Sequence, residues 1–299
     1  MRESLEQAIK NAIVFECLLP HKDIDKSCLT CKKDVCLKNE DPMGISKVIY
    51  NGIVEFAVNE FDIDYDDLEK EQRRVILSRI RYNSKADEVT KLRYGFYGEV
   101  LLDLILRVFC KTNVIAARGY FYSPIENSEP KGFDAFHLLE RNEELELWFG
   151  EAKFYSSYKK AIRPVLEKLE TSLSDDYLRR NLIAIITERE HISAHNPHFD
   201  ALLDSWMDNP SINLIEEMKL RNMRLVYPIF IAYEKLDKDD YFQSIKKCID
   251  YISEECAQKG VNIPATFDYK LFFIFLPMSK VKQIKERVIQ WIDSEEPLI

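Results

Sequence analysis

The sequence predicts an α/β fold with a central mixed sheet flanked by helices. Residues 133–139 and 145–155 are rich in aromatic and branched side chains, which indicates two strands of a β-hairpin. Two more strands are expected, each followed by a helix: residues 224–233 and 239–258, then residues 270–276 and 279–293. Strands that alternate with helices are typical of a sheet covered by helices.

Composition and charge narrow the class of protein. The chain has 299 residues, 46% of them hydrophobic and 31% charged, which is enough apolar material for a core and unlike a disordered chain. It shows no secretory signal and no apolar run near the roughly 20 residues of a membrane span, and its seven cysteines are scattered. We therefore expect a bacterial cytoplasmic protein without a membrane partner.

The net charge of −9 argues against long-range attraction to nucleic acid. Any contact with DNA would have to use local basic patches, a bound metal or a partner protein.

The N-terminal portion is expected to be mainly helical. Apolar residues at helical spacing predict a helix over residues 4–17. The cysteines that follow suggest a zinc or iron–sulfur site formed by four thiolates, or by three together with His21, or else free thiols; these cysteines are Cys17, Cys28, Cys31 and Cys36.

The next segments lead to a strongly predicted helix. Residues 46–61 are apolar without a clear period, so helix and strand both remain open, and residues 68–81 indicate a basic helix that is either solvated or in contact with phosphate. Residues 94–110 form the strong helix prediction, and residues 113–122 read as a strand.

The predicted helix over residues 94–110 carries one polar stripe. Glu99, Asp103 and Arg107 are spaced at i, i+4 and i+8, so they lie on one narrow side of an otherwise apolar helix. Such a stripe meets either solvent or a functional site.

The hairpin itself holds the main candidate site. A four-residue loop at 141–144 would place Glu140 opposite Leu145, and the same register places Asp134 across from Glu151. Because side chains alternate along a strand, Lys153 shares their face. Two neighbouring carboxylates repel each other unless a cation lies between them, so this pattern predicts a divalent metal site.

Two helices are expected after the hairpin, at residues 157–172 and 175–188. Beyond them, His191, His195 and His198 are close enough in sequence to suggest a metal site. Pro197 interrupts their spacing, so capping or surface roles are favoured.

The order of helix with Glu99, strand, Asp134 strand, Glu151-x-Lys153 strand and helix resembles the core of the PD-(D/E)xK nuclease superfamily. In this interpretation Asp134, Glu151 and the backbone carbonyl of Ala152 bind Mg²⁺ (or Mn²⁺), which activates water. Lys153 orients or deprotonates that water, and Glu99 is a further ligand, directly or through water. His137 points to the opposite face and is a supporting or structural residue.

The motifs Tyr-Gly-Glu99, Gly-x-Asp134-x-x-His137 and Leu-Trp-Phe-Gly-Glu151-Ala-Lys153-Phe-Tyr resemble the HamA family, the nuclease subunits of Hachiman anti-phage systems. The resemblance covers roughly residues 90–295. It implies a metal-dependent DNase held in check by a superfamily-2 helicase (HamB-like) until DNA is sensed. The candidate DNA contacts are Lys159, Lys160 and Arg163.

The resemblance also suggests a division of the chain. Residues 89–299 would form the nuclease domain, and residues 1–88 a cysteine-bearing portion for partner binding or a small metal lobe. Two other functions stay open: a non-catalytic subunit that regulates a helicase, and a sequence-specific restriction endonuclease.

Overall fold

The structure is a computed structural model, and it describes residues 1–22, 24–25, 30–121, 132–142, 144–189, 192 and 196–299. Within these residues, seven strands form one sheet in the order β1-β2-β7-β6-β5-β4-β3. Their bounds are β1 Ile13–Leu19, β2 Asp34–Asn39, β3 Asn113–Val114, β4 Ala135–Arg141, β5 Glu144–Tyr155, β6 Arg224–Glu234 and β7 Tyr269–Met278. Strands β5, β6, β7 and β2 run parallel to one another. The pairs β1–β2, β3–β4 and β4–β5 are antiparallel.

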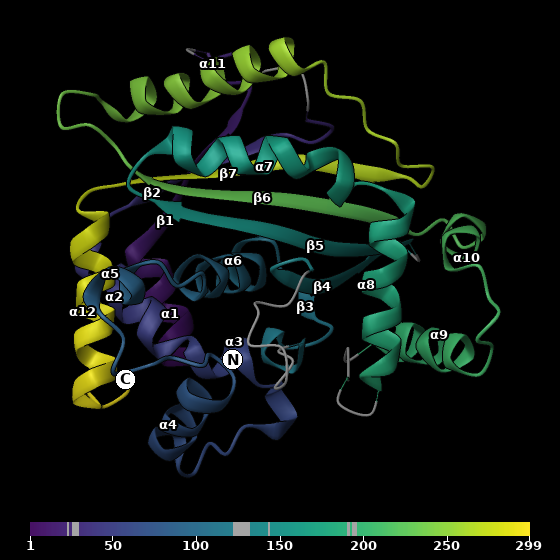
Figure 1. Cartoon of the computed structure of the whole chain (residues 1–299), viewed down its shortest axis with the longest axis horizontal. Coiled ribbons are helices and arrows are strands. Elements are labelled where there is room, and N and C mark those ends of the chain that lie inside the picture. Colours follow the sequence, from purple (N-terminus) through teal and green to yellow (C-terminus); the bar gives the residue numbers. More distant parts are fainter. Residues whose placement is uncertain (23, 26–29, 122–131, 143, 190–191, 193–195) are drawn as a thin grey trace.

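Helices cover both faces of the sheet (Figure 1). The helices are α1 Glu3–Ala12, α2 Pro42–Asn51, α3 Ile53–Ala57, α4 Leu68–Ser78, α5 Glu88–Leu92, α6 Phe96–Phe109, α7 Tyr158–Ser172, α8 Asp175–Thr187, α9 Pro197–Met207, α10 Leu214–Leu220, α11 Tyr241–Lys259 and α12 Val281–Ser294, with short 3₁₀ turns η1 Glu60–Asp62 and η2 Arg118–Phe121. One face packs against α1, α2, α6 and α12. The other packs against α7, α8 and α11. The predicted α/β architecture with a flanked mixed sheet is confirmed.

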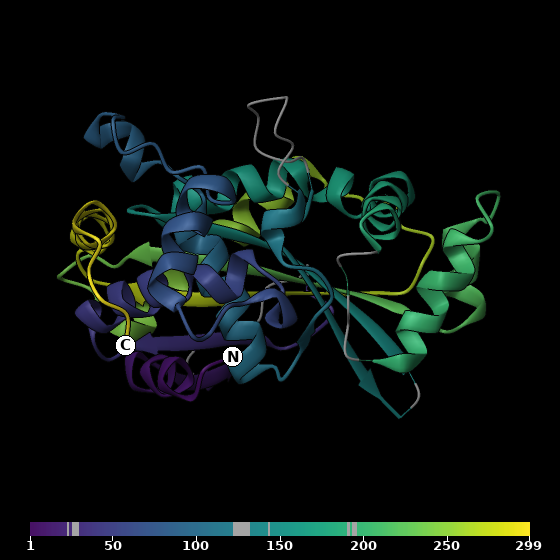
Figure 2. The same cartoon turned by 90° about the horizontal axis from the view of Figure 1, so that it is seen from below.

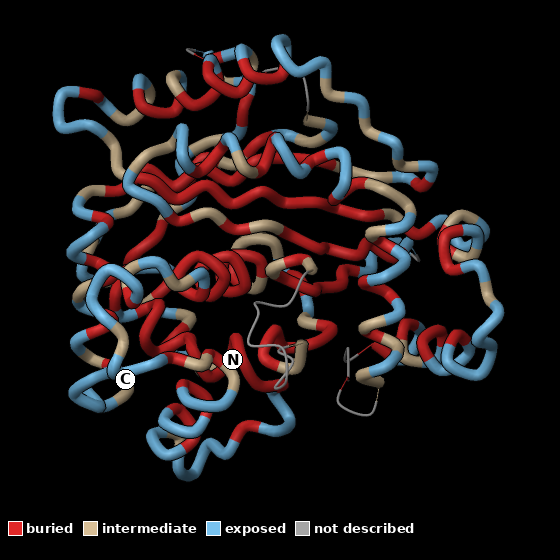
Figure 3. The backbone as a smooth tube through the Cα atoms, in the orientation of Figure 1, coloured by how far each residue is buried: buried red, intermediate tan, exposed pale blue. Residues whose placement is uncertain are grey.

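The central strands are buried along nearly their whole length (Figure 3). Strand β6 has apolar residues on both faces, as expected of a parallel strand between two helical layers. The predicted strands at 224–233 and 270–276 are therefore confirmed, as are the helices that follow them. The predicted helices at 68–81, 94–110, 157–172 and 175–188 are also confirmed, with small changes at their ends.

The hairpin register is confirmed. Glu140 pairs with Leu145, and Ala135 pairs with Gly150, next to Asp134 and Glu151. The predicted four-residue loop is wrong, because Arg141 also pairs with Glu144 and leaves a two-residue turn. Asn142 adopts a φ of 51° there, a conformation that tight hairpin turns need and that asparagine tolerates.

Two segments depart from prediction. The first helix ends at Ala12, and residues 13–19 form β1, where the β-branched and aromatic side chains Ile13, Val14 and Phe15 suit a strand. The predicted strand at 113–122 keeps only β3, and within its described residues the chain turns into η2. The open choice at residues 46–61 is settled as helix, in α2 and α3. Helices α9 and α10, not predicted, join α8 to β6.

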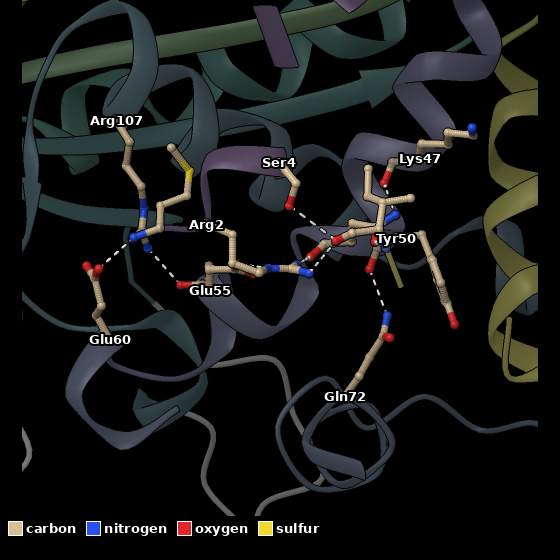
Figure 4. A network of polar contacts seen from close by, with 11 residues as sticks. Arg2, Ser4, Lys47, Tyr50, Glu55, Glu60, Gln72 and Arg107 are labelled. Carbon is tan, nitrogen blue, oxygen red and sulfur yellow. Dashed lines mark hydrogen bonds and ion pairs between the residues drawn. The ribbon is translucent and has the colours of Figure 1, made fainter. Parts of the chain in front are cut away.

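The N-terminal and C-terminal ends lie on the same side of the sheet (Figures 1 and 2), and hydrogen bonds join their residues to each other and to the end of α2. Arg2 donates to the carboxylate of buried Glu55 at 2.7 Å and to the carbonyl of Ile299 at 3.0 Å. Arg107 donates to the carbonyl of Glu55 at 2.7 Å, which connects this network to α6 (Figure 4). Strands β1 and β2 also extend the sheet at β7, so the two predicted portions of the chain share one sheet. The division of the chain into residues 1–88 and residues 89–299 stays a prediction.

None of the helices in the described part of the chain is both long and apolar enough to cross a membrane.

Candidate active site

Strand β5 carries the central residues of the site near its carboxyl end. Glu151 and Lys153 pair with Ile229 and Ile231 of β6, which fixes them to the rigid middle of the sheet. They continue the face that Phe149 presents to α7. This face opens into a cleft of about 910 Å³, lined by residues from β5, α6, α7, α8 and α12.

Asp134 directly precedes β4, at the open end of the hairpin, and hydrogen bonds hold it against β5. Its backbone N–H donates to the carbonyl of Gly150 at 2.7 Å, and its Oδ2 accepts from the N–H of Ala152 at 2.8 Å. Its side chain therefore lies on the same face as Glu151 and Lys153. The structure brings these three predicted residues together.

Glu99 reaches the cleft from the first turn of α6. A Cβ added at Gly98 would lie 3.2 Å from the Cβ of Phe154, closer than nearly all such contacts. Glycine there lets α6 approach β5 closely, and this approach brings Glu99 to the rim of the site. Of the predicted polar stripe, Glu99 lines the cleft, whereas Asp103 and Arg107 belong to the buried network around His137.

The electrostatics of the cleft reflect crowded carboxylates. Burial, together with the negative charge of Asp134, raises the pKa of Glu151 to about 7. Burial opposes the charge of Lys153, but Glu151 and Asp134 outweigh it and raise the pKa of Lys153. Lys153 Nζ forms a short ion pair with Glu151 and donates to the carbonyl of Ala152 at 3.1 Å. Lys153 is thus a partly buried cation that partly offsets the paired acids.

Arg118 is a residue of the site that the sequence analysis missed. Its side chain is 5% exposed; its Nε lies 3.8 Å from Glu99 Oε2, and its Nη2 lies 3.8 Å from Asp134 Oδ1. A charged residue within the apolar run from Ile115 to Phe121 was the available signal. The apolar run itself predicts a strand, and this pattern obscures the signal.

Other basic and hydroxyl side chains also line the cleft. They include Arg93, Lys168, Tyr177, Lys282 and Lys285. Lys285 was recognisable from its place on the apolar side of α12, among Val281, Ile284 and Val288. The predicted DNA contacts Lys159, Lys160 and Arg163 are instead exposed on α7 and lie outside the described lining of this cleft.

His137 lies on the opposite face, as expected. It is fully buried, with Nδ1 2.8 Å from Thr112 Oγ1 and Nε2 2.8 Å from Asp103 Oδ1. Burial lowers the pKa of His137, although Asp103 beside it acts in the other direction. The ring ties β4 to α6 and does not touch the cleft.

The side chains and carbonyls of the cleft include the kinds of donor that a divalent metal needs. Asp134, Glu151, the Ala152 carbonyl and Glu99 are oxygen donors, the ligands that Mg²⁺ and Mn²⁺ prefer. The pKa of Glu151 is raised by burial and by the charge of Asp134, so a further positive charge between the two acids would stabilise their ionised forms. Among the described residues, no three ligating side chains already converge on one point. The oxygen donors are therefore of the type that suits Mg²⁺ or Mn²⁺. In this structure Lys153 and Arg118 provide positive charge beside them.

The N-terminal cysteines are only partly covered by the described residues. Cys17 and Cys36 face each other across β1 and β2, and burial raises the pKa of both thiols. Cys31 is exposed, and Cys28 lies outside the described residues. His21 stacks on Phe242. A zinc or iron–sulfur site there stays a prediction.

The histidine cluster is similarly incomplete, because His191 and His195 lie outside the described residues. His198 is exposed, with its Nδ1 3.3 Å from Glu140 Oε1. Asn196 caps α9 by accepting from the N–H of Phe199 at 2.9 Å. Of the three histidines, His198 thus has the surface role that the sequence favoured, and the roles of His191 and His195 stay a prediction.

Comparisons with known proteins give one family. Neither the curated proteins nor the solved structures gave a match to this chain. The family model HamA matches residues 9–292. Because that match spans nearly all of the 299 residues, the chain belongs to the HamA family.

Proposed function

We propose that this protein is a metal-dependent deoxyribonuclease. The observation that carries the proposal is the convergence of Asp134, Glu151 and Lys153 on one face of the β4–β5 hairpin, inside a cleft. Paired carboxylates with a neighbouring, partly buried lysine are suited to phosphodiester hydrolysis, because the acids hold a metal and the ammonium stabilises negative charge.

Each residue has a chemical task in this proposal. Asp134, Glu151 and the Ala152 carbonyl would hold Mg²⁺ or Mn²⁺, with Glu99 as a further ligand. When bound, the metal supplies Lewis-acid activation of a water and offsets charge on the phosphate. Lys153 orients that water through its Nζ, which already lies among the same oxygens.

Basic side chains on the cleft walls support a nucleic-acid substrate. Arg93, Lys168 and Lys282 are exposed and line the cleft from three different elements, although the whole chain carries a charge of −9. Phosphate contacts of this kind provide affinity without reading sequence. They favour a nuclease with little sequence preference over a restriction endonuclease.

We further propose that the nuclease is the effector of a two-component anti-phage system, with a superfamily-2 helicase as partner. Membership of the HamA family associates the chain with the Hachiman defence system. A partner that delivers DNA would compensate for the unfavourable net charge. The partnership is tested by asking whether a neighbouring gene encodes such a helicase and whether that helicase copurifies with the chain; a neighbour of this kind that does not copurify would contradict the proposal.

The nuclease proposal is tested with purified protein, free of any partner, and supercoiled plasmid in Mg²⁺ or in EDTA. We expect cleavage in Mg²⁺ only, and a loss of at least about 100-fold in Glu151→Gln and in Lys153→Ala. The matched controls are Glu217→Gln and Lys219→Ala, which alter the same Glu-x-Lys pattern on α10. They should cut like the wild type.

Two outcomes contradict the proposal. Full cleavage by the Glu151→Gln, Lys153→Ala double variant would exclude these residues from catalysis. No cleavage by the wild type, with helicase binding retained, would favour a non-catalytic regulatory subunit. A ladder of discrete fragments in place of a smear would favour a restriction endonuclease.

A further inference from the structure

Arg118 lies between Glu99 and Asp134, two acids that would be metal ligands in the proposed function. Its Nε is 3.8 Å from Glu99 Oε2, and its Nη2 is 3.8 Å from Asp134 Oδ1. These separations exceed direct hydrogen bonds, so the interaction is mainly one of charge. Because the side chain is 5% exposed, water screens that charge poorly.

We propose that Arg118 binds the phosphate of the substrate and that its positive charge weakens metal binding until the phosphate arrives. This inference rests on the proposed function, because it concerns the same cleft. A guanidinium keeps its charge and binds phosphate through paired N–H groups, which suits it to this task. A cation beside Asp134 repels an incoming metal ion and attracts an incoming phosphate.

The position of Arg118 is set by the neighbouring backbone. Gly119 packs so closely that an added Cβ would lie 2.3 Å from the carbonyl oxygen of Ala57 in α3. The N–H of Ala117 donates to Asn59 Oδ1 at 2.9 Å, and Arg79 donates to the carbonyl of Gly119 at 3.3 Å. Contacts on both sides of Arg118 therefore anchor η2 to the segment formed by α3, η1 and α4.

This anchoring distinguishes Arg118 from a surface arginine. Its backbone is held by a part of the chain distant in sequence, and its guanidinium enters the cleft that holds Asp134 and Glu99. A side chain fixed in advance loses little freedom when it binds an anion. Arg118 is thus preorganised to bind phosphate.

The test measures two affinities separately. Isothermal titration calorimetry gives the Kd for Mn²⁺ without DNA, and fluorescence anisotropy gives the Kd for a labelled DNA oligonucleotide in EDTA. For Arg118→Gln we expect Mn²⁺ to bind at least about tenfold more tightly and the oligonucleotide at least about tenfold more weakly. Arg118→Lys, which keeps the charge, should change both affinities less.

The matched control is Arg189→Gln. Arg189 also lies between two acids, 3.3 Å from Asp200 and 2.6 Å from Asp204, but outside the described lining of the cleft. Both affinities should match the wild type. If Arg118→Gln does not fold, as judged by its circular dichroism melt, Arg118→Met removes the same charge and keeps more of the apolar packing.

The inference requires that Arg118→Gln change the Mn²⁺ affinity and the oligonucleotide affinity in opposite directions. A merely structural role would weaken both affinities, and either that result or no change in both would overturn the inference. If the affinities shift in opposite directions while Glu151→Gln still cuts plasmid, the effect of Arg118 on the two affinities stands, but the nuclease proposal fails and with it the assignment of the phosphate to a substrate of this cleft. If Glu151→Gln is inactive but Arg118→Gln weakens both affinities, only this inference fails.

Discussion

Lys285 is the most buried cation on the α12 side of the cleft. It is 9% exposed and donates to the carbonyls of Leu92 at 3.1 Å and Phe154 at 3.0 Å. Its ammonium also lies 5.0 Å from the ring centres of Tyr97 and Phe154. The side chain thereby joins α12 to the end of β5 and to the segment before α6.

Burial lowers the pKa of Lys285 from 10.5 to about 8. Between these two values the unfolded chain holds a proton that the folded chain has released, so the free energy of unfolding rises with pH in this window. Relative to Lys285→Met, the wild type should gain about 1–2 kcal/mol between pH 7 and pH 9.5. Urea denaturation at both pH values measures this gain.

The control for this prediction is Lys282→Met, one turn earlier on α12, where the side chain is 65% exposed. It should show no such dependence on pH. If the wild type gained the same free energy of unfolding between pH 7 and pH 9.5 relative to both variants, the burial of Lys285 would not be the cause of the pH dependence.

At the same scale, the sequence identified the residues of the hairpin but not their neighbours. Asp134, Glu151 and Lys153 were predictable because the β-pairing rule relates positions on two adjacent strands. Arg118 was not, because its place depends on η2 packing against α3, 60 residues earlier in the chain. No local pattern encodes that contact.

Among the elements, η2 offers the clearest test of backbone packing. In Gly119→Ala the new methyl group meets the Ala57 carbonyl oxygen, and neither backbone can yield without moving its element. We expect a loss of about 1–3 kcal/mol in the free energy of unfolding, measured by denaturation.

Gly44→Ala is the comparison for this variant. Its Cβ would lie 2.8 Å from Asp41 Oδ2, and this side chain, whose Oδ1 caps α2 by accepting from the N–H of Met43 at 2.9 Å, can shift at the expense of that cap without moving the backbone. This helical glycine should cost less to replace, since alanine also favours the helix. A larger loss at Gly44 than at Gly119 would contradict the packing argument.

The errors in element prediction share one physical cause. Residues 13–19 continue the apolar character of α1, and only pairing with β2 makes them a strand. Beyond β3, the residues predicted as strand up to Phe121 turn away from β4, because Ala117 and Gly119 bond to and pack against the α3–α4 region. Tertiary contacts decided both cases, whereas β6 and β7 were predictable because burial on both faces leaves a continuous apolar run.

Over the whole molecule, the network around Glu55 connects the first residues, the last residue and α6 (Figure 4). The side chain of Glu55 is 1% exposed and forms an ion pair with Arg2, whose Nε lies 2.7 Å from Glu55 Oε1. Arg2→Met should lower the free energy of unfolding by about 3 kcal/mol, because it leaves a buried carboxylate without its cation. Thermal or chemical denaturation provides the measurement.

The double variant Arg2→Met, Glu55→Leu separates this effect from simple loss of packing. Removing both charges should restore part of the lost stability. A double variant less stable than Arg2→Met alone would show that the ion pair is not the source.

The place of β2 in the sheet has a consequence for biosynthesis. Val35 and Cys36 pair with Ile274 and Phe275, so β2 leaves the ribosome long before its partner strand β7 is made. Such non-local pairing is slow to form and leaves strand edges open in the nascent chain. The α12 wall of the cleft follows β7 in the chain and is made later still. A nascent chain that has not yet reached α12 would therefore lack both the finished sheet and the finished cleft, so the proposed DNA cleavage would begin only once α12 has been made.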